Sequence, residues 1–137
     1  MASTLFRGPV LVGKKNEAGV TGYNIEQKDS NYTVVISNGD CGKTLLSNTK
    51  DVVFTLPSIA IGNVFTFVNT GADGQNNLTI SPVSIDGILY LGSLTDNKDL
   101  INTQATSKVG DYVTIASLNS VVFWTVVDSQ GVWAKEA

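Results

Sequence analysis

The feature that most constrains this sequence is its division, from Tyr32 onward, into short β-rich runs that end at turn residues. Runs of Val, Ile, Thr and aromatic residues bounded by Gly, Pro, Asn and Asp are typical of β-strands. No window of helical length carries an apolar stripe of period 3.6, and the best candidate for a helical turn, residues 94–108, is dominated by Asn, Thr and Ser. We predict strands at residues 32–37, 51–56, 63–69, 78–81, 88–91, 111–117, 121–127 and 132–135.

Regularly spaced strands of this kind predict an all-β fold. Parallel strands within one sheet need long crossover connections, usually helices, and the sequence offers none. We therefore expect an antiparallel β-sandwich or barrel, a jelly roll being one form of it, with an extended N-terminal arm. Within residues 63–69, Val64, Thr66 and Val68 should point to one face and Phe65 and Phe67 to the other.

The first 30 residues differ from the rest of the chain. They contain several glycines and Pro9, lack sustained periodicity, and carry four basic against three acidic residues, whereas residues 31–137 carry five against nine. We predict an N-terminal arm or leader at 1–30 and a β-rich domain at 31–137. The arm is either a loose terminus or a segment that docks on another protein. In the docking interpretation the attachment residues are Leu5, Phe6, Arg7, Val10, Leu11 and Val12.

Composition argues against several classes of chemistry. His is absent, which removes the usual general base, the Ser–His and Cys–His nucleophile pairs, and most zinc sites. The net charge of −3 argues against a nucleic-acid partner. The segment ending in Gly42, Lys43 and Thr44 is similar to a phosphate-binding loop, but position 37, where the pattern needs its first glycine, is Ser37. We expect no catalytic residue, no cofactor and no metal.

The chain start and the single cysteine bear on where the protein is made. Arg7, Gly8 and Pro9 interrupt any apolar run of signal-peptide length. No stretch approaches the roughly 18 apolar residues of a membrane span, and Cys41 has no partner for an intrachain disulfide. We expect synthesis in a reducing cytoplasm and no membrane partner.

The predicted strand at 121–127 is apolar on both faces, which requires cover from a second layer of this chain or from another subunit. Aromatic residues in strand-rich chains more often fill a core or an interface than form a sugar-binding platform, so packing is the favoured role of Tyr112 and of the two tryptophans. The predicted oligomer interface consists of Val122, Trp124, Val126 and Trp133.

Seven short segments resemble, in their order, a pattern found in small structural proteins of tailed-bacteriophage virions, of the head-decoration or head-fibre type. They are FTLP (54–57), FTFVNTGADG (65–74), LTISP (78–82), DNKDLINT (96–103), VGDYVTI (109–115), FWTV (123–126) and GVWA (131–134). The resemblance covers roughly residues 51–137, and residues 1–50 match nothing in the pattern. It implies β-rich, trimeric domains that bind a capsid lattice or terminate a fibre, and it supplies no catalytic residues.

Together the residues and the resemblance predict a non-enzymatic virion structural protein. The first hypothesis is a capsid decoration (cement) protein that binds the major capsid protein on the capsid surface and stabilises the assembled head as a homotrimer. The alternative is a receptor- or glycan-binding tip domain of a phage fibre or tail. A third class, a small hydrolase with paired carboxylates, would draw on Asp73, Asp86 and Asp99.

Overall fold

The computed structural model describes residues 25–118 and 122–137, and these form β-strands with two short 3-10 helices. The nearly all-β character predicted from the sequence is confirmed. In chain order the elements are β1 Ile25–Gln27, β2 Tyr32–Thr33, η1 Ile36–Asn38, β3 Thr44–Ser47, β4 Val52–Thr55, β5 Val64–Asn69, β6 Leu78–Ser81, β7 Gly87–Leu89, β8 Leu100–Asn102, η2 Gln104–Thr106, β9 Asp111–Ala116, β10 Phe123–Gln130 and β11 Trp133–Lys135.

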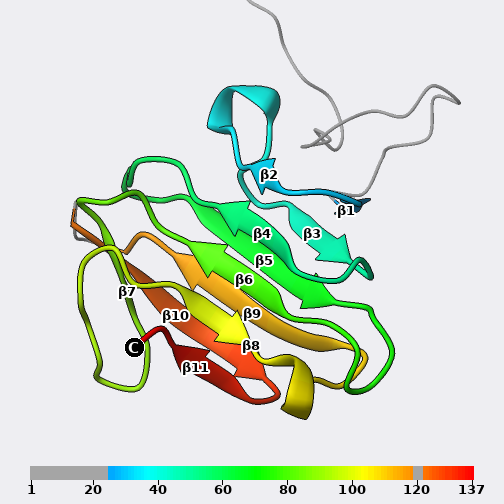
Figure 1. The fold of residues 1–137 in the computed structure, drawn as a ribbon. Coiled ribbons are helices and arrows are strands. Elements are labelled where there is room, and N and C mark those ends of the chain that lie inside the picture. The colour runs from blue at the N-terminus through cyan, green and yellow to red at the C-terminus, as the bar shows by residue number, and fades with distance from the viewer. Residues whose placement is uncertain (1–24, 119–121) are drawn as a thin grey trace, which may run out of the picture.

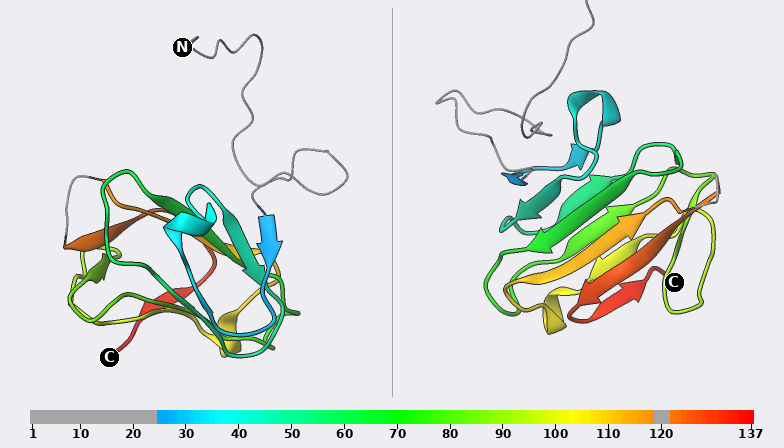
Figure 2. Two further views of the ribbon diagram at one scale, coloured as in Figure 1. Left: turned by 90° about the horizontal axis from the view of Figure 1, so that it is seen from above. Right: turned by 180° about the vertical axis from the view of Figure 1, so that it is seen from behind.

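The strands form two sheets that pack against each other as a β-sandwich (Figures 1 and 2). One sheet has six strands in the order β1-β3-β5-β9-β10-β7, and the other has five in the order β11-β8-β6-β4-β2. The two sheets bury a single cluster of apolar side chains between them. This arrangement confirms the predicted sandwich.

The sheets are mixed rather than purely antiparallel. The first half of the chain winds as a coil, by which we mean that each turn of the chain adds one strand to each of the two sheets. From β1 to β6 the chain alternates between the two sheets, so that β1, β3 and β5 are parallel neighbours in one and β2, β4 and β6 in the other. Parallel strands need a crossover connection. Here the crossover is a strand of the opposite sheet, and no helix is required.

The second half of the chain closes the sandwich with antiparallel ladders. Strand β9 lies between β5 and β10 and is antiparallel to both, while β8 pairs antiparallel with β6 and β11. The short strand β7 then pairs parallel with β10 at the edge of the six-stranded sheet.

Aromatic side chains fill the centre of the core. Phe65 and Phe67 point inward from β5, as predicted, while Val64, Thr66 and Val68 point outward. The ring centroids of Phe65 and Trp124 lie 5.6 Å apart and those of Phe54 and Phe67 lie 5.1 Å apart, within the range of favourable aromatic contacts. Burying such a side chain stabilises the fold by about 1.5–3 kcal/mol, so these rings make a large contribution to the core.

The structure differs locally from the predicted strands in the first third of the chain. Residues 25–27, predicted to belong to the arm, pair with β3 as strand β1. The predicted strand at 32–37 is reduced to β2, and the residues after it form the 3-10 helix η1, which ends at Gly39 with φ 77°. Residues 94–108, the best helical candidate, contain β8 and η2.

Candidate functional site

The residues predicted to form sites fall into three groups in the structure. The predicted attachment residues between Leu5 and Val12 lie outside the described part of the chain. Trp124 and Trp133 are buried in the core of the sandwich. Val122 is exposed, and Val126 is partly buried against the core, so these two are the members of the predicted interface set that reach the surface.

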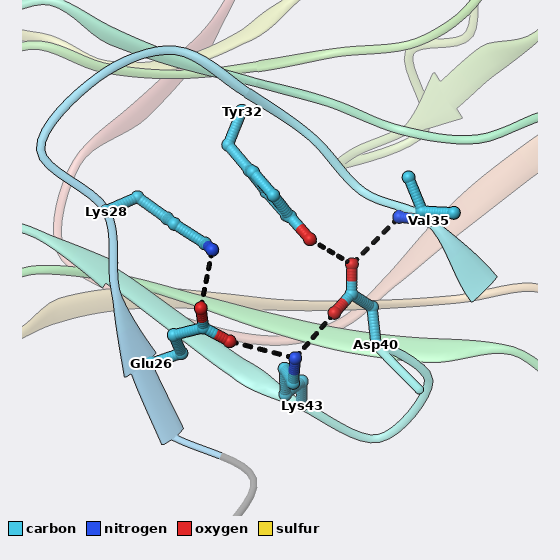
Figure 3. Close-up of polar contacts among 6 residues, drawn as sticks. All are labelled: Glu26, Lys28, Tyr32, Val35, Asp40 and Lys43. Carbon is cyan, nitrogen blue, oxygen red and sulfur yellow. Dashed lines mark hydrogen bonds and ion pairs between the residues drawn. The ribbon is translucent and has the colours of Figure 1, made fainter. Parts of the chain in front are cut away.

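The most concentrated polar chemistry of the described residues surrounds Lys43, at the end of the sandwich where the coil begins. The Lys43 side chain is 5% exposed, and its Nζ lies 2.6 Å from Asp40 Oδ1 and 2.9 Å from Glu26 Oε2 (Figure 3). A tight turn carries Asp40 and Lys43, closed by the bond from the Lys43 amide to the Asp40 carbonyl. Glu26 comes from β1, which pairs with β3 directly after this turn.

The contacts of this cluster join segments of the same chain. The second oxygen of Asp40 accepts hydrogen bonds from Tyr32 Oη at 2.6 Å and from the Val35 amide at 2.8 Å. Lys28 Nζ donates to Glu26 Oε1 at 2.6 Å and lies 3.8 Å from the centre of the Tyr32 ring, a cation–π contact. The cluster therefore ties β1, β2 and the turn before β3 to one another.

The charges in the cluster stabilise one another. Accordingly, the pKa values of the two carboxylates are lowered and the pKa of Lys43 is raised. Burial alone would raise the pKa of Asp40, but hydrogen bonds from Lys43, Tyr32 and Val35 outweigh it and hold that pKa below its ordinary value. Hydrogen bonds from Lys28 and Lys43 lower the pKa of Glu26. Burial would lower the pKa of Lys43, but its bonds to Asp40 and Glu26 raise it instead. All three groups are held in their charged forms.

The arrangement favours a structural role for the cluster. A general base needs a pKa near the working pH, and an attacking amine must be neutral, whereas here the pKa directions favour a carboxylate and an ammonium. The ammonium of Lys43, the residue that a phosphate-binding loop would use, is held between two carboxylates of the same chain. The cluster therefore holds the first strands of the chain against one another.

The three carboxylates named for a hydrolase lie in different surroundings. Asp73 precedes β6 and forms an exposed ion pair with Lys108. Asp86 follows β6 and is buried. Asp99 precedes β8, and its backbone bonds to the backbone and side chain of Glu136. Asp73 and Asp86 therefore lie at opposite ends of the sandwich.

The feature that the sequence reasoning missed is an accumulation of exposed aliphatic side chains at one end of the sandwich. We call this surface the apolar loop end. It consists of Ile36, Ile61, Val64, Ile85, Leu91, Leu94, Leu118 and Val122. Leu91 is 90% exposed and Ile85 74%. The connections at 56–63, 82–86 and 90–99 gather at the same end of the ribbon, while η1, which carries Ile36, stands apart above β2 (Figure 1).

Backbone hydrogen bonds join the connections of the apolar loop end. The Gly42 amide donates to the Val64 carbonyl at 2.7 Å, and the Gly62 amide to the Ser117 carbonyl at 2.9 Å. The Gly87 amide donates to the Val122 carbonyl at 3.2 Å. These backbone hydrogen bonds hold the connections to one another and to the ends of the strands, and the exposed apolar side chains project from these connections.

The two ends of the sandwich differ in character. The opposite end is formed by the connections at 48–51, 70–77, 103–110 and 131–132, which are rich in Asn, Thr, Gly and Asp. Of the exposed large aliphatic residues in the described chain, only Val109 and Val132 lie there. Exposed apolar side chains that gather in one region of a small protein can mark an interaction site. The sequence held a signal for it, because Ile61 and Leu91 each stand beside a turn glycine, Gly62 and Gly92, where polar residues are usual.

No family model matches the chain, and no curated protein matches it. Within residues 25–118 and 122–137, no group of three or more His, Cys, Asp or Glu side chains is placed to hold a metal ion. None of the helices in that part of the chain has the length and apolar character needed to cross a membrane.

Proposed function

We propose that this protein is a non-enzymatic virion structural protein, a capsid decoration protein that binds the major capsid protein and stabilises the assembled head as a homotrimer. The observation that carries the proposal is the apolar loop end, a set of exposed aliphatic side chains on connections that backbone hydrogen bonds join. The resemblance of residues 51–137 to small phage virion proteins supports the same assignment.

Such a protein acts through binding energy alone. A ligand that binds the assembled shell better than its separate subunits stabilises the assembled state by mass action. Three copies on a local symmetry axis would engage the lattice through three identical contacts, and the linked contacts would raise the avidity without requiring a strong single contact. Leu5 to Val12 would add apolar area if that segment orders on docking.

The apolar loop end can be tested with charged variants and a matched control. We expect Ile85→Asp combined with Leu91→Asp to abolish saturable binding of the purified protein to undecorated capsids. The control places the same change at the opposite end, as Val109→Asp with Val132→Asp, and should leave binding intact. Circular dichroism checks that both variants fold. Equal binding by the two variants would contradict the proposed surface.

The alternative, a receptor- or glycan-binding fibre tip, depends on aromatic residues at the surface. Trp124 and Trp133 are buried, and Tyr112, which is half-buried, uses its hydroxyl to donate to Asp128 at 2.9 Å. Copy number separates the two proposals, because a decoration protein is present in hundreds of copies per virion and a tip in few.

A further inference from the structure

The connection between β7 and β8 carries Leu91, the most exposed of the large apolar side chains in the described part of the chain, at 90%. This connection projects beyond the two sheets (Figures 1 and 2). Isolated bridges pair Gly87 with Asp96 and Tyr90 with Ser93, so its first half is an antiparallel hairpin with Leu91 at the tip. A single exposed leucine is common on protein surfaces. What sets Leu91 apart is the backbone that presents it.

Leu91 occupies a backbone conformation that suits other residue types better. Its φ is 48°, and that of Gly92 is 78°. Positive φ at both central residues of a two-residue hairpin loop characterises a type I′ turn, in which Asn-Gly is strongly preferred. A leucine in this position is strained, because at positive φ its Cβ atom crowds the backbone. The chain therefore has Leu-Gly at a turn that Asn-Gly would form more easily.

The rest of the described chain follows the ordinary preference for positive φ. Its other two residues of this kind, glycines aside, are Asp51 and Asn97, at 60° and 59°. Asp and Asn tolerate this conformation because their short polar side chains bond locally to the backbone. Leu91 is the exception, and its exposure means that packing within the described chain compensates little for the strain. Strain of this kind is concentrated at functional sites.

The hairpin fixes the position of its tip. The Tyr90 amide donates to the Ser93 carbonyl at 3.1 Å, and the Ser93 amide donates to the Tyr90 carbonyl at 2.9 Å. The Tyr90 side chain packs against the core. A Cβ atom at Gly92, in contrast, would meet nothing within 4 Å. The base of the tip is thus attached to the sandwich, while the tip itself stands clear of it.

The chemistry of the hairpin suits burial against an apolar surface. Residues 87–95 contain no charged side chain. The amides and carbonyls of Tyr90 and Ser93 are already bonded to each other. Unpaired charges and polar groups without hydrogen bonds are the groups that oppose burial. An apolar pocket could therefore receive the Leu91 side chain without removing a charge from water.

We propose that Leu91 is the anchor of the apolar loop end and inserts its side chain into an apolar pocket of the major capsid protein. A projecting aliphatic tip requires a concave partner, of about the size of one leucine side chain. Interfaces commonly draw most of their binding energy from a few residues of this kind. This inference rests on the proposed function, and it assigns the main contact of that function to one residue.

The proposal predicts that one substitution changes stability and binding in opposite directions. Leu91→Asn creates the preferred Asn-Gly turn and should raise the midpoint of thermal unfolding by about 2–4 °C. The same change removes the aliphatic side chain, and it should weaken binding to undecorated capsids by about 10- to 100-fold. A residue with a purely structural role would not combine a gain in stability with a loss of binding.

Three further variants separate strain from apolar contact. Leu91→Ala keeps the Cβ atom that causes the strain, so it should weaken binding without the gain in stability. Leu91→Met keeps an apolar side chain of similar size and should bind nearly as well as the wild type. Val132→Asn is the matched control: it removes an exposed aliphatic side chain beside the turn glycine Gly131 at the opposite end, and it should leave binding unchanged.

The outcomes distinguish this inference from the proposed function. A wild-type protein that does not bind capsids contradicts the proposed function and the anchor with it. If the wild type binds and Leu91→Asn binds equally well, the anchor alone is overturned, because the other residues of the apolar loop end then suffice. A Leu91→Asn variant that gains no stability also overturns the inference, because the turn then lacks the strain on which it depends.

Discussion

At the scale of single residues, the Asp40–Lys43 pair is the most consequential interaction. Removing one partner of a buried ion pair leaves an uncompensated charge and destabilises a protein by about 3–5 kcal/mol. We expect Lys43→Met to lower the free energy of unfolding by about that amount in urea titrations. Adding Asp40→Asn, which keeps a hydrogen-bond acceptor for Tyr32 and Val35, should recover part of the loss. A Lys43→Met variant as stable as wild type would contradict the burial of this pair.

The same cluster predicts how stability depends on acid. The folded-state pKa values of Asp40 and Glu26 lie below their ordinary values. Their contribution to stability is therefore present above the ordinary carboxylate pKa, about 4, and is lost as the pH falls through the lower folded values. We expect the unfolding free energy to decline below about pH 4, and to decline less steeply in Asp40→Asn. If the unfolding free energies of the wild-type protein and of Asp40→Asn declined in parallel with falling pH, Asp40 would not be a source of the acid sensitivity.

At the scale of elements, the turn between β10 and β11 depends on a close approach. Gly131 has φ +96°, and a Cβ there would lie 2.2 Å from Asp111 Cγ. The Asp111 carboxylate accepts from Asn102 and from the Lys108 amide, each at 2.9 Å, so it cannot move without breaking those bonds.

Gly131→Ala should therefore destabilise the protein more than Gly62→Ala, because Gly62, at φ +93°, has nothing within 4 Å of the position that an added methyl group would take. Both changes carry the strain of a positive φ, and the difference between them isolates the clash with Asp111. Thermal unfolding of the two variants measures it. Equal losses of stability would show that the Asp111 network yields to the added methyl group.

Strand patterns were predictable where one strand has two distinct faces. The alternation in β5 and the limits of β6 follow from residue types alone. Strands β1, β3 and β8 were not predicted: β1 lies in the segment assigned to the arm, and β8 lies in a segment dominated by Asn, Thr and Ser. The coil and the Lys43 cluster were also beyond prediction, since only the pairing of β1 with β3 brings Glu26 to Lys43. For Trp124, the apolar pattern fitted a core and an interface equally well.

At the scale of the whole molecule, the apolar loop end is the surface proposed to meet a capsid lattice. The N-terminal residues are proposed to add to the lattice contact. We expect deletion of residues 1–12 to weaken binding to capsids and to leave the folded domain intact by circular dichroism. Loss of the fold in that variant would show that the segment belongs to the core.

The central claim is that this protein stabilises an assembled shell by adhering to it. The most direct measurement is the temperature at which undecorated capsids disassemble, with and without saturating protein. We expect a higher disassembly temperature with the wild-type protein and no increase with the Ile85→Asp and Leu91→Asp double variant. An unchanged temperature with the wild-type protein, at concentrations that saturate any binding, would contradict the claim.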